Sequence, residues 1–322
     1  MRFGVIINVR SRRNSRLLPA LREVMGERPG IYAVELDGIC GLNAALRDLA
    51  AQEVRLLVVV GGDGTVQAVL THLLSGDGSG FAEPPMLCVL AGGTTNMTAA
   101  DVGVRGRPDR ALRRLIDLPP ESIGLRGTML DRHVVEVVRG DDPPRFGMFF
   151  GAGAICRAIR LARRSVHPMR LGSSLESALT LAGVFGERLF GGGDERDRVM
   201  RGDDITIARN DGPPVRATTL LALCTTLDRL VLRSRPFWGG EQGPLRCTRI
   251  GYPAPRFWRS VPRIMYGREG RDLEAPAYAS CNADSIRLEM DCPFTIDGEL
   301  FESSRTVPIV LRGDRRVRFV RF

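Results

Sequence analysis

Two apolar runs that each end in a cluster of glycines constrain the fold of this chain more than any other feature. The first run, Leu56–Val60, leads into Gly61-Gly62-Asp63-Gly64-Thr65. The second, Met86–Leu90, leads into Ala91-Gly92-Gly93-Thr94-Thr95-Asn96. Short β-branched runs followed by glycines and then by helix-like sequence indicate a strand, a tight turn and a helix.

Both turns are predicted to lie at the carboxyl ends of strands in one sheet, where they would form a phosphate-binding crevice. Glycine lets the backbone approach a ligand, and a helix start offers unpaired amides to an anion. Asp63 and Asn96 have a structural alternative as helix caps, and the turns have one as ordinary strand-to-helix connections. The three glycines around Asp63 favour a functional carboxylate, because a cap does not need them. The candidate nucleotide-binding residues are Gly61, Gly62, Asp63, Gly64, Thr65, Val66, Gln67, Gly93, Thr94 and Asn96.

Strand-like and helix-like segments alternate over residues 1–126. Further strands are expected at Phe3–Val9 and Tyr32–Leu36, and helices at Leu42–Ala50 and Val66–Leu74. This alternation predicts an α/β domain with a doubly wound parallel sheet, which we interpret as the nucleotide-binding domain.

The pattern then changes to short alternating strands separated by turn signals such as Asp141–Pro144 and Asn210–Pro214. It predicts an antiparallel, β-sandwich-like domain over residues 127–303 that would hold the substrate. Residues 304–322 are expected to form strands, and these could return to the first domain. The strands expected after residue 126 are Val134–Val138, Phe146–Phe150, Ile205–Ala208, Thr218–Cys224, Ile286–Met290 and Thr306–Leu311.

Composition excludes several function classes. All 46 basic residues are arginine, so a Walker-type lysine and a Schiff-base lysine are excluded. The seven cysteines show no metal-ligand or disulfide-like spacing, which indicates a reduced, cytoplasmic setting. No run of about twenty apolar residues is present, and Met1–Asn8 is too short for a signal peptide. The net charge of +9 could attract anionic lipid, but no nucleic-acid motif accompanies it, so no nucleic-acid partner is expected.

Two segments combine arginine with apolar side chains. Ile155–Leu171 has the pattern of a basic amphipathic helix, which suits either an anionic membrane surface or a surface helix packed on the core. Phe237-Trp238 and Phe257-Trp258 are flanked by arginines and suit either a membrane interface or partly buried packing.

The glycine motifs resemble the catalytic domain of the diacylglycerol kinase family, which also includes related lipid kinases. That family combines Gly-Gly-Asp-Gly-Thr with a later Gly-Thr-x-Asn, as in Gly93-Thr94-Thr95-Asn96. Phe294–Glu299 resembles its Asp-Gly-Glu segment, and Ile6-Ile7-Asn8 falls where the family has a strand ending in Asn-Pro. The resemblance implies that Asn8 meets the nucleotide and that Asp63, Asp297 and Glu299 are catalytic, with Glu299 as the general base.

The chain departs from the family at two acidic positions. Met97 replaces the aspartate that follows Gly-Thr-x-Asn, and Glu241–Leu245 lacks the aspartate that helps to hold magnesium in the second domain. Asp101 lies one helical turn after Met97 and is the candidate substitute as a metal ligand. The alternatives are a rebuilt ion network, a different substrate or lost catalysis.

The resulting hypothesis is an ATP- and Mg²⁺-dependent lipid kinase that phosphorylates a lipid hydroxyl of the diacylglycerol or sphingoid type. Such an enzyme would meet its substrate at a membrane surface, as a cytoplasmic protein on the inner face. The sequence leaves both a monomer and a homodimer open. The alternatives are a phosphotransferase of the NAD-kinase type, which shares Gly-Gly-Asp-Gly-Thr, and a non-catalytic nucleotide- or lipid-binding regulator.

Overall fold

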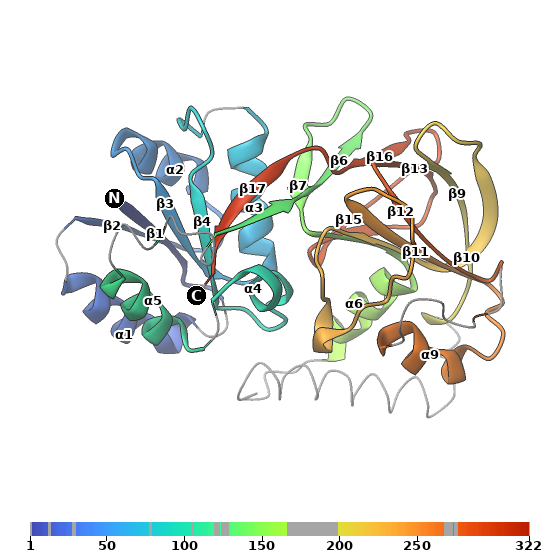
Figure 1. The fold of residues 1–322 in the computed structure, drawn as a ribbon, viewed down its shortest axis with the longest axis horizontal. Helices are drawn as coiled ribbons and strands as arrows, with labels where there is room; N and C mark the ends of the chain where they lie inside the picture. Colours follow the sequence, from blue (N-terminus) through green and yellow to red (C-terminus); the bar gives the residue numbers. More distant parts are fainter. Residues whose placement is uncertain are drawn as a thin grey trace. The chain divides into compact units, whose positions relative to one another are not determined.

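The computed structural model of the 322-residue chain describes residues 2–11, 14–27, 30–76, 79–104, 106–118, 123, 129–165, 199–266, 273 and 276–321. The chain divides into two compact units. The first unit comprises Met1–His133 and Arg316–Phe322, and the second comprises Val134–Arg315. Each unit has its own sheet (Figure 1).

The first unit contains a six-stranded sheet in the order β2-β1-β3-β4-β17-β5. Its first four strands are parallel, and Phe3 of β1 pairs with Ile31 of β2 and with Leu56 of β3. Strand β3 is buried along its whole length, because helices cover both faces of such a sheet. The strands are β1 (Phe3–Asn8), β2 (Ile31–Leu36), β3 (Leu56–Gly61), β4 (Met86–Ala91), β5 (Met129–His133) and β17 (Arg316–Val320).

Helices lie on both faces of this sheet, which confirms the predicted doubly wound α/β fold (Figure 1). Val5 and Ile7 of β1 share a buried cluster with residues of α1 and α5. Gly4, directly before Val5, faces the side chain of Leu49 on α2. The helices are α1 (Asn14–Gly26), α2 (Leu42–Ala51), α3 (Asp63–Leu74), α4 (Met97–Val102) and α5 (Pro108–Asp117).

The last two strands in the order of this sheet, β17 and β5, come from beyond residue 126. Strand β17 runs parallel to β4, with Phe319 opposite Leu87, and β5 pairs antiparallel with β17. The division between the units therefore falls at His133 and Arg316 rather than at residues 126 and 303, which were expected from the sequence. The reason is that the hydrogen bonds of β5 and β17 belong to the first sheet.

The second unit consists mainly of one antiparallel sheet, which has eleven strands within the described residues. Strand β10 connects its two parts. Val215–Thr219 of β10 pairs with β9, and Leu221–Thr225 pairs with β8. Antiparallel pairing throughout confirms the predicted character of this unit, and the sharing of β10 explains its sandwich-like form. The strands are β6 (Val135–Arg139), β7 (Arg145–Gly147), β8 (Phe149–Gly153), β9 (Asp203–Arg209), β10 (Val215–Thr225), β11 (Leu245–Gly251), β12 (Tyr278–Ala283), β13 (Ser285–Glu289), β14 (Phe294–Ile296), β15 (Glu299–Phe301) and β16 (Ile309–Arg312).

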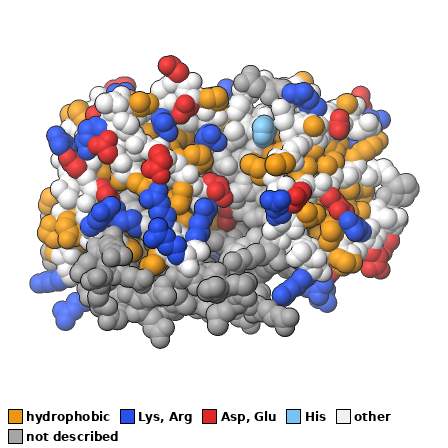
Figure 2. Space-filling view, turned by 180° about the vertical axis from the view of Figure 1, so that it is seen from behind, with side chains coloured by type: hydrophobic (Ala, Val, Ile, Leu, Met, Phe, Trp, Pro, Cys, Tyr) orange, Lys and Arg blue, Asp and Glu red, His pale blue; other side chains and the backbone are white. Residues whose placement is uncertain are grey.

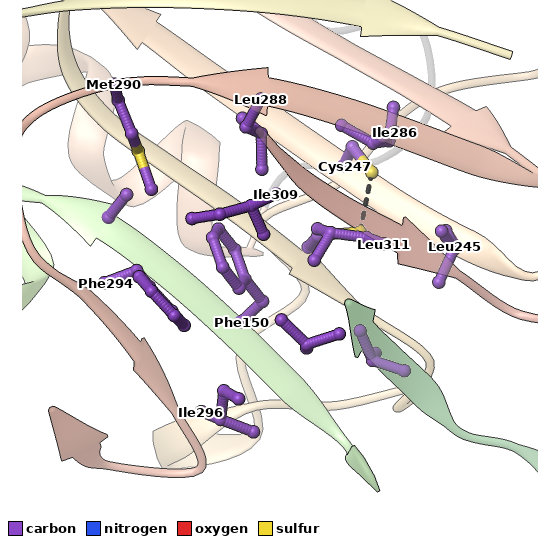
Figure 3. Packing of buried hydrophobic residues seen from close by; sticks show 14 of the residues in the cluster. Phe150, Leu245, Cys247, Ile286, Leu288, Met290, Phe294, Ile296, Ile309 and Leu311 are labelled. Carbon is purple, nitrogen blue, oxygen red and sulfur yellow. Dashed lines mark hydrogen bonds between the residues drawn. The ribbon is translucent and has the colours of Figure 1, made fainter. Parts of the chain in front are cut away.

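The core of the second unit lies on the inner face of this sheet (Figure 3). Phe150 stacks on Phe294, with ring centroids 5.4 Å apart, and the fully buried Leu311 belongs to the same cluster. Inward-facing residues alternate with exposed ones along each strand, as in Ile286 and Leu288 of β13 on either side of the exposed Arg287.

Helices α6 (Ala154–Ser165) and α9 (Phe257–Tyr266) pack around a second, smaller cluster that includes Leu220, Ile250 and Ile264. Helix α6 confirms the first half of the predicted basic helix. Residues 166–171 of that segment lie outside the described residues.

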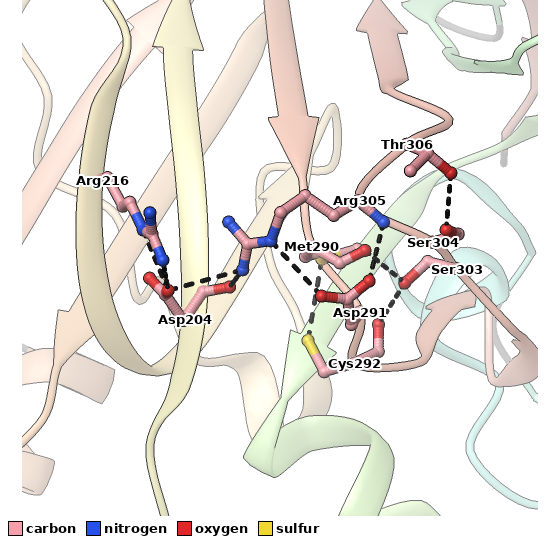
Figure 4. A network of polar contacts seen from close by, with 9 residues as sticks. All are labelled: Asp204, Arg216, Met290, Asp291, Cys292, Ser303, Ser304, Arg305 and Thr306. Atoms are coloured by element: carbon pink, nitrogen blue, oxygen red, sulfur yellow. Dashed lines mark hydrogen bonds and ion pairs between the residues drawn. The ribbon is translucent and has the colours of Figure 1, made fainter.

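A polar network fixes the segment after β15 to the outside of the second sheet (Figure 4). Arg305 donates to the backbone oxygen of Asp204 at 2.6 Å and pairs with the carboxylate of Asp291 at 3.3 Å. Asp204 also pairs with Arg216 at 2.5 Å. Arginine side chains form several separate groups on the face shown in Figure 2.

Candidate functional site

The two glycine turns lie directly against each other in the first unit. The amide of Gly92 donates to the carbonyl oxygen of Gly61 at 2.8 Å. A β-carbon on Gly93 would come within 2.5 Å of the α-carbon of Gly62, and one on Gly62 within 3.2 Å of the α-carbon of Gly93. The glycines at these two positions are therefore required by contact between the turns, whatever else they bind.

Asp63 connects the two turns. It is the first residue of α3, and its carboxylate accepts hydrogen bonds from the amides of Met97 at 3.0 Å and Thr98 at 2.9 Å. These are the first two amides of α4, so Asp63 caps that helix from outside, where negative charge is favourable. The sequence offers Asp63 as a cap of its own helix, α3. In the structure its carboxylate instead caps the next helix, α4. Burial raises the pKa of the Asp63 carboxyl above its ordinary value, although both amides favour the ionised form.

The start of α3 offers amides to an anion. The amides of Thr65 and Val66 donate to the carbonyl of Gly62, at 3.0 and 3.2 Å. The amides of Asp63 and Gly64 come before them, where an α-helix has no internal acceptor. This position fits a phosphate group through backbone N–H groups and the helix dipole, which suits a chain without lysine.

The second turn is held by its own asparagine. Asn96 adopts the left-handed conformation at φ 50°. Its side-chain oxygen accepts from the amide of Gly93, and its side-chain nitrogen donates to the Gly93 carbonyl, both at 2.7 Å. The buried Asn96 amide thus closes the turn that contains Thr94, and it makes no side-chain cap to α4.

Asn8, at the end of β1, lies beside Thr65 in the first turn of α3. The buried Asn8 side chain donates to the Thr65 hydroxyl at 2.8 Å and accepts from the Arg10 amide at 3.0 Å. Val66 and Gln67 are buried in α3, and the Gln67 amide donates to the Thr71 hydroxyl at 3.1 Å. The structure therefore places all the predicted nucleotide-binding residues at one edge of the first sheet.

Sequence reasoning missed Asn14, the first residue of α1. Its fully buried side-chain nitrogen donates to the carbonyls of Asn8 and Val60, both at 2.8 Å. Its side-chain oxygen lies 2.4 Å from where a β-carbon on Gly92 would be. Asn14 ties the ends of β1 and β3 to the second turn. The available signal was a polar residue soon after the first predicted strand.

Asp101, the candidate metal ligand, lies in the first unit beside an arginine. Its carboxylate is buried and pairs with Arg132 of β5 at 3.4 Å. Within the described residues, no three His, Cys, Asp or Glu side chains are grouped so as to hold a metal ion. The ligand role of Asp101 stays a prediction.

Asp297 and Glu299 lie on a hairpin of the second unit rather than on one extended stretch. Asp297 and Gly298 have φ values of 48° and 93° and form the two-residue turn between β14 and β15. The Asp297 carboxylate accepts from the amides of Met148 and Phe149, both at 2.9 Å. Because of this turn, the two carboxylates do not point to one face, as they would on an extended strand. Asp297 is buried and holds the hairpin on β8, and its catalytic role stays a prediction.

Glu299 differs from Asp297 in being exposed. Its carboxylate lies 3.3 Å from the guanidinium of Arg163 on α6, and its side chain is 54% accessible. An exposed carboxylate beside one cation is free to accept a proton from a substrate hydroxyl.

The second unit contains an apolar cavity of about 390 Å³. Strands from both parts of the sheet line it, with Phe150, Ile207, Cys247, Leu288 and Leu311 among the lining residues. Val215, also in the lining, is 56% exposed, so the cavity reaches the surface beside the β9–β10 turn. A cavity of this size and lining suits the hydrocarbon part of a ligand.

The first unit is similar to the catalytic domain of a kinase family. Residues 2–125 match the family model of the diacylglycerol kinase catalytic domain, which confirms the predicted resemblance over that segment. A search of curated proteins found no match.

Solved structures share the fold over the whole chain. A diacylglycerol kinase from Bacillus anthracis superposes with a TM-score of 0.62 at 14% identity, covering 99% of this chain and 96% of that one. Yeast NADH kinase in complex with NADH gives a TM-score of 0.52 at 10% identity, covering 100% of this chain and 84% of that one. At these identities the likeness is one of fold alone.

No helix among the described residues is both long and apolar enough to cross a lipid bilayer.

Proposed function

We propose that this protein is an ATP-dependent kinase that transfers a phosphoryl group to a lipid hydroxyl. The observation that carries the choice of a lipid is the apolar cavity inside the second unit. A nicotinamide dinucleotide is polar along its whole length and would gain little from such a lining, whereas a hydrocarbon chain gains from every buried methylene. The family match over residues 2–125 supports the same choice.

The nucleotide phosphates would bind at the start of α3, to the amides of Asp63 and Gly64. Asp63 holds α4 and the second turn in place, and therefore fixes the shape of the surface that the phosphates meet. Rigid placement of the phosphates contributes to the rate because the reacting groups need no further ordering.

Glu299 would accept the proton of the lipid hydroxyl. Arg163 lies 3.3 Å from its carboxylate, and the exposure of Glu299 leaves room for the hydroxyl. Asp297 would act indirectly, since its carboxylate holds the β14–β15 hairpin on which Glu299 begins β15.

The test is phosphoryl transfer from radiolabelled ATP to a total lipid extract, with separation of the lipids afterwards. We expect one labelled lipid class, and a fall in turnover of about a hundred- to ten-thousand-fold in Glu299→Gln. Glu302→Gln is the matched control, because Glu302 pairs with Arg160 of the same helix at 2.7 Å and is more exposed.

Three results would decide against the proposal. Labelling of a nicotinamide nucleotide instead of a lipid would favour the NAD-kinase alternative. Binding of ATP without transfer to any acceptor would favour a regulatory protein. Equal activity of Glu299→Gln and Glu302→Gln would remove Glu299 from the reaction.

A further inference from the structure

Two segments of the second unit lie together at its surface and form what we call the α9 face. They are residues 229–235 and residues 252–266, and the latter includes α9. The amide of Arg235 donates to the Met265 carbonyl at 2.7 Å, and the Tyr266 hydroxyl donates to the Leu232 carbonyl at 3.3 Å. These contacts hold the turn of residues 229–235 against the end of α9.

The α9 face is rich in positive charge. Neither segment contains an aspartate or a glutamate. The nearest acid before them in sequence is Asp228, which is paired with Arg246 at 2.8 Å, and the nearest after them is Glu269. An anion that approaches this face therefore meets arginines, and neither segment supplies an acidic side chain to repel it. The exposed arginines are Arg229, Arg233, Arg235, Arg256, Arg259 and Arg263.

Apolar side chains accompany the arginines. Five large hydrophobic side chains are exposed among the described residues, and three of them, Val231, Tyr252 and Tyr266, belong to the α9 face. Tyr266 is 59% exposed. Trp258 is partly buried and stands edge-on to Phe257, with ring centroids 5.0 Å apart.

The backbone of the α9 face is held in an uncommon conformation. Leu232, Arg233 and Arg256 have φ values of 56°, 59° and 51°, which side-chain-bearing residues rarely adopt. On its inner side, α9 is anchored by the buried Ile264 in the second core cluster. Such a conformation persists only where the surrounding structure enforces it, and such positions gather at ligand sites. The surface is therefore preformed.

From these observations we propose that the α9 face docks on the surface of an anionic lipid bilayer. Arginines would contact the lipid phosphates, while Val231, Tyr252 and Tyr266 would enter the interface between headgroups and acyl chains. Tyrosine and tryptophan suit that depth, because one end of each ring is apolar and the other is polar. Charge complementarity selects the occupant, since a zwitterionic surface offers no net charge to the arginines.

This proposal stands apart from the kinase proposal, because it concerns binding and needs no turnover. Phosphorylation of a dispersed short-chain lipid without vesicles would test the kinase proposal alone. Vesicle binding without ATP tests the α9 face alone, so the failure of one is distinguishable from the failure of the other.

The experiment measures binding of the full chain to phosphatidylcholine vesicles with and without phosphatidylglycerol. We expect binding to the anionic vesicles that weakens with salt. In Arg259→Gln/Arg263→Gln, affinity should fall about thirtyfold, which is about 1 kcal/mol for each arginine near the surface. The matched control is Arg55→Gln/Arg110→Gln, which removes the same charge from exposed positions of the first unit and should bind like the parent.

A second readout uses the parent protein and needs no variant. The chain has two tryptophans, Trp238 and Trp258, and Trp258 lies within α9. Tryptophan emission should shift to shorter wavelength on anionic vesicles and be quenched by lipids brominated near the headgroup.

Four outcomes would overturn the proposal. The first two are equal vesicle affinity of the parent and Arg259→Gln/Arg263→Gln, and an equal loss of vesicle affinity in the control Arg55→Gln/Arg110→Gln. The other two are unquenched tryptophan emission in the bound protein, and tighter binding to a single-stranded oligonucleotide than to vesicles.

Discussion

Replacing Asp63 by asparagine should destabilise the first unit as well as affect turnover. The Asp63 carboxylate accepts from the amides of Met97 and Thr98, at 3.0 and 2.9 Å. Asparagine keeps one acceptor and turns an NH₂ group toward the other amide. One hydrogen bond to a charged group is lost, which costs about 1.5–3 kcal/mol. The favourable charge at the start of α4 is lost as well, at about 0.3–1 kcal/mol.

Burial offsets part of this loss. The pKa of the Asp63 carboxyl is raised by burial, which shows that keeping the charged form in place has a free-energy cost. Asparagine avoids that cost, so we expect a net loss of about 2 kcal/mol in the free energy of unfolding. For a unit of this size, that corresponds to a fall of about 4–8 °C in Tm.

Urea unfolding and hydrogen exchange measure the effect together. Exchange should quicken in the peptide spanning residues 93–104, since its amides lose their acceptor. Asp48→Asn, at an exposed position of α2, is the control and should leave both quantities unchanged. Unchanged stability and unchanged exchange in Asp63→Asn would refute the cap. Lost turnover in such a stable variant would then assign Asp63 to the chemistry alone.

Three further predictions concern stability and reactivity. Gly93→Ala should lower Tm by several degrees in a thermal melt, because its methyl group would lie 2.5 Å from the backbone of the other turn, and an unchanged Tm would show that the turns separate easily. Arg216 lowers the pKa of Asp204, so this pair stabilises the fold above the ordinary aspartate pKa and loses that effect as pH falls through the lowered value. In urea unfolding, Arg216→Gln should be less stable than the parent at pH 6, and the difference should vanish in strong acid. A difference in the free energy of unfolding that does not depend on pH would contradict this prediction. Iodoacetamide at neutral pH should label the exposed Cys40 before Cys88, since burial raises the pKa of the Cys88 thiol to about 12. Peptide mass spectrometry would follow the labelling, and early labelling of Cys88 would contradict this prediction.

The first unit was largely predictable because its signals are local. The apolar runs of β3 and β4 are buried on both faces, and each of their glycine turns follows its strand directly. The positions of Asp63 and Asn96 at one sheet edge follow from that pattern. The hydrogen-bond partners of Asp63 do not follow from that pattern. Met97 and Thr98 come after a different strand, and only the packing of β3 beside β4 brings them close to Asp63.

The second unit was predictable in type but less so in detail. The alternation at β9, β10 and β13 was readable, whereas β11 and β12 carry cysteine, threonine and arginine and gave no clear alternation. The partners of Asp101 and Asp297 also escaped the sequence. Arg132 is distant in sequence from Asp101, and Asp297 bonds to backbone amides, which leave no trace in residue identity.

The place of β17 has a consequence for the order in which this protein can fold. Strand β17 lies between β4 and β5. The first sheet can therefore add these last two strands only after Arg316–Val320 has left the ribosome. Until then β4 lacks its partner strand at Leu87, which is fully buried in the finished fold. The second unit, whose residues are contiguous, can close first. A chain stopped before Arg316 would therefore hold a finished second unit and an open, aggregation-prone first sheet.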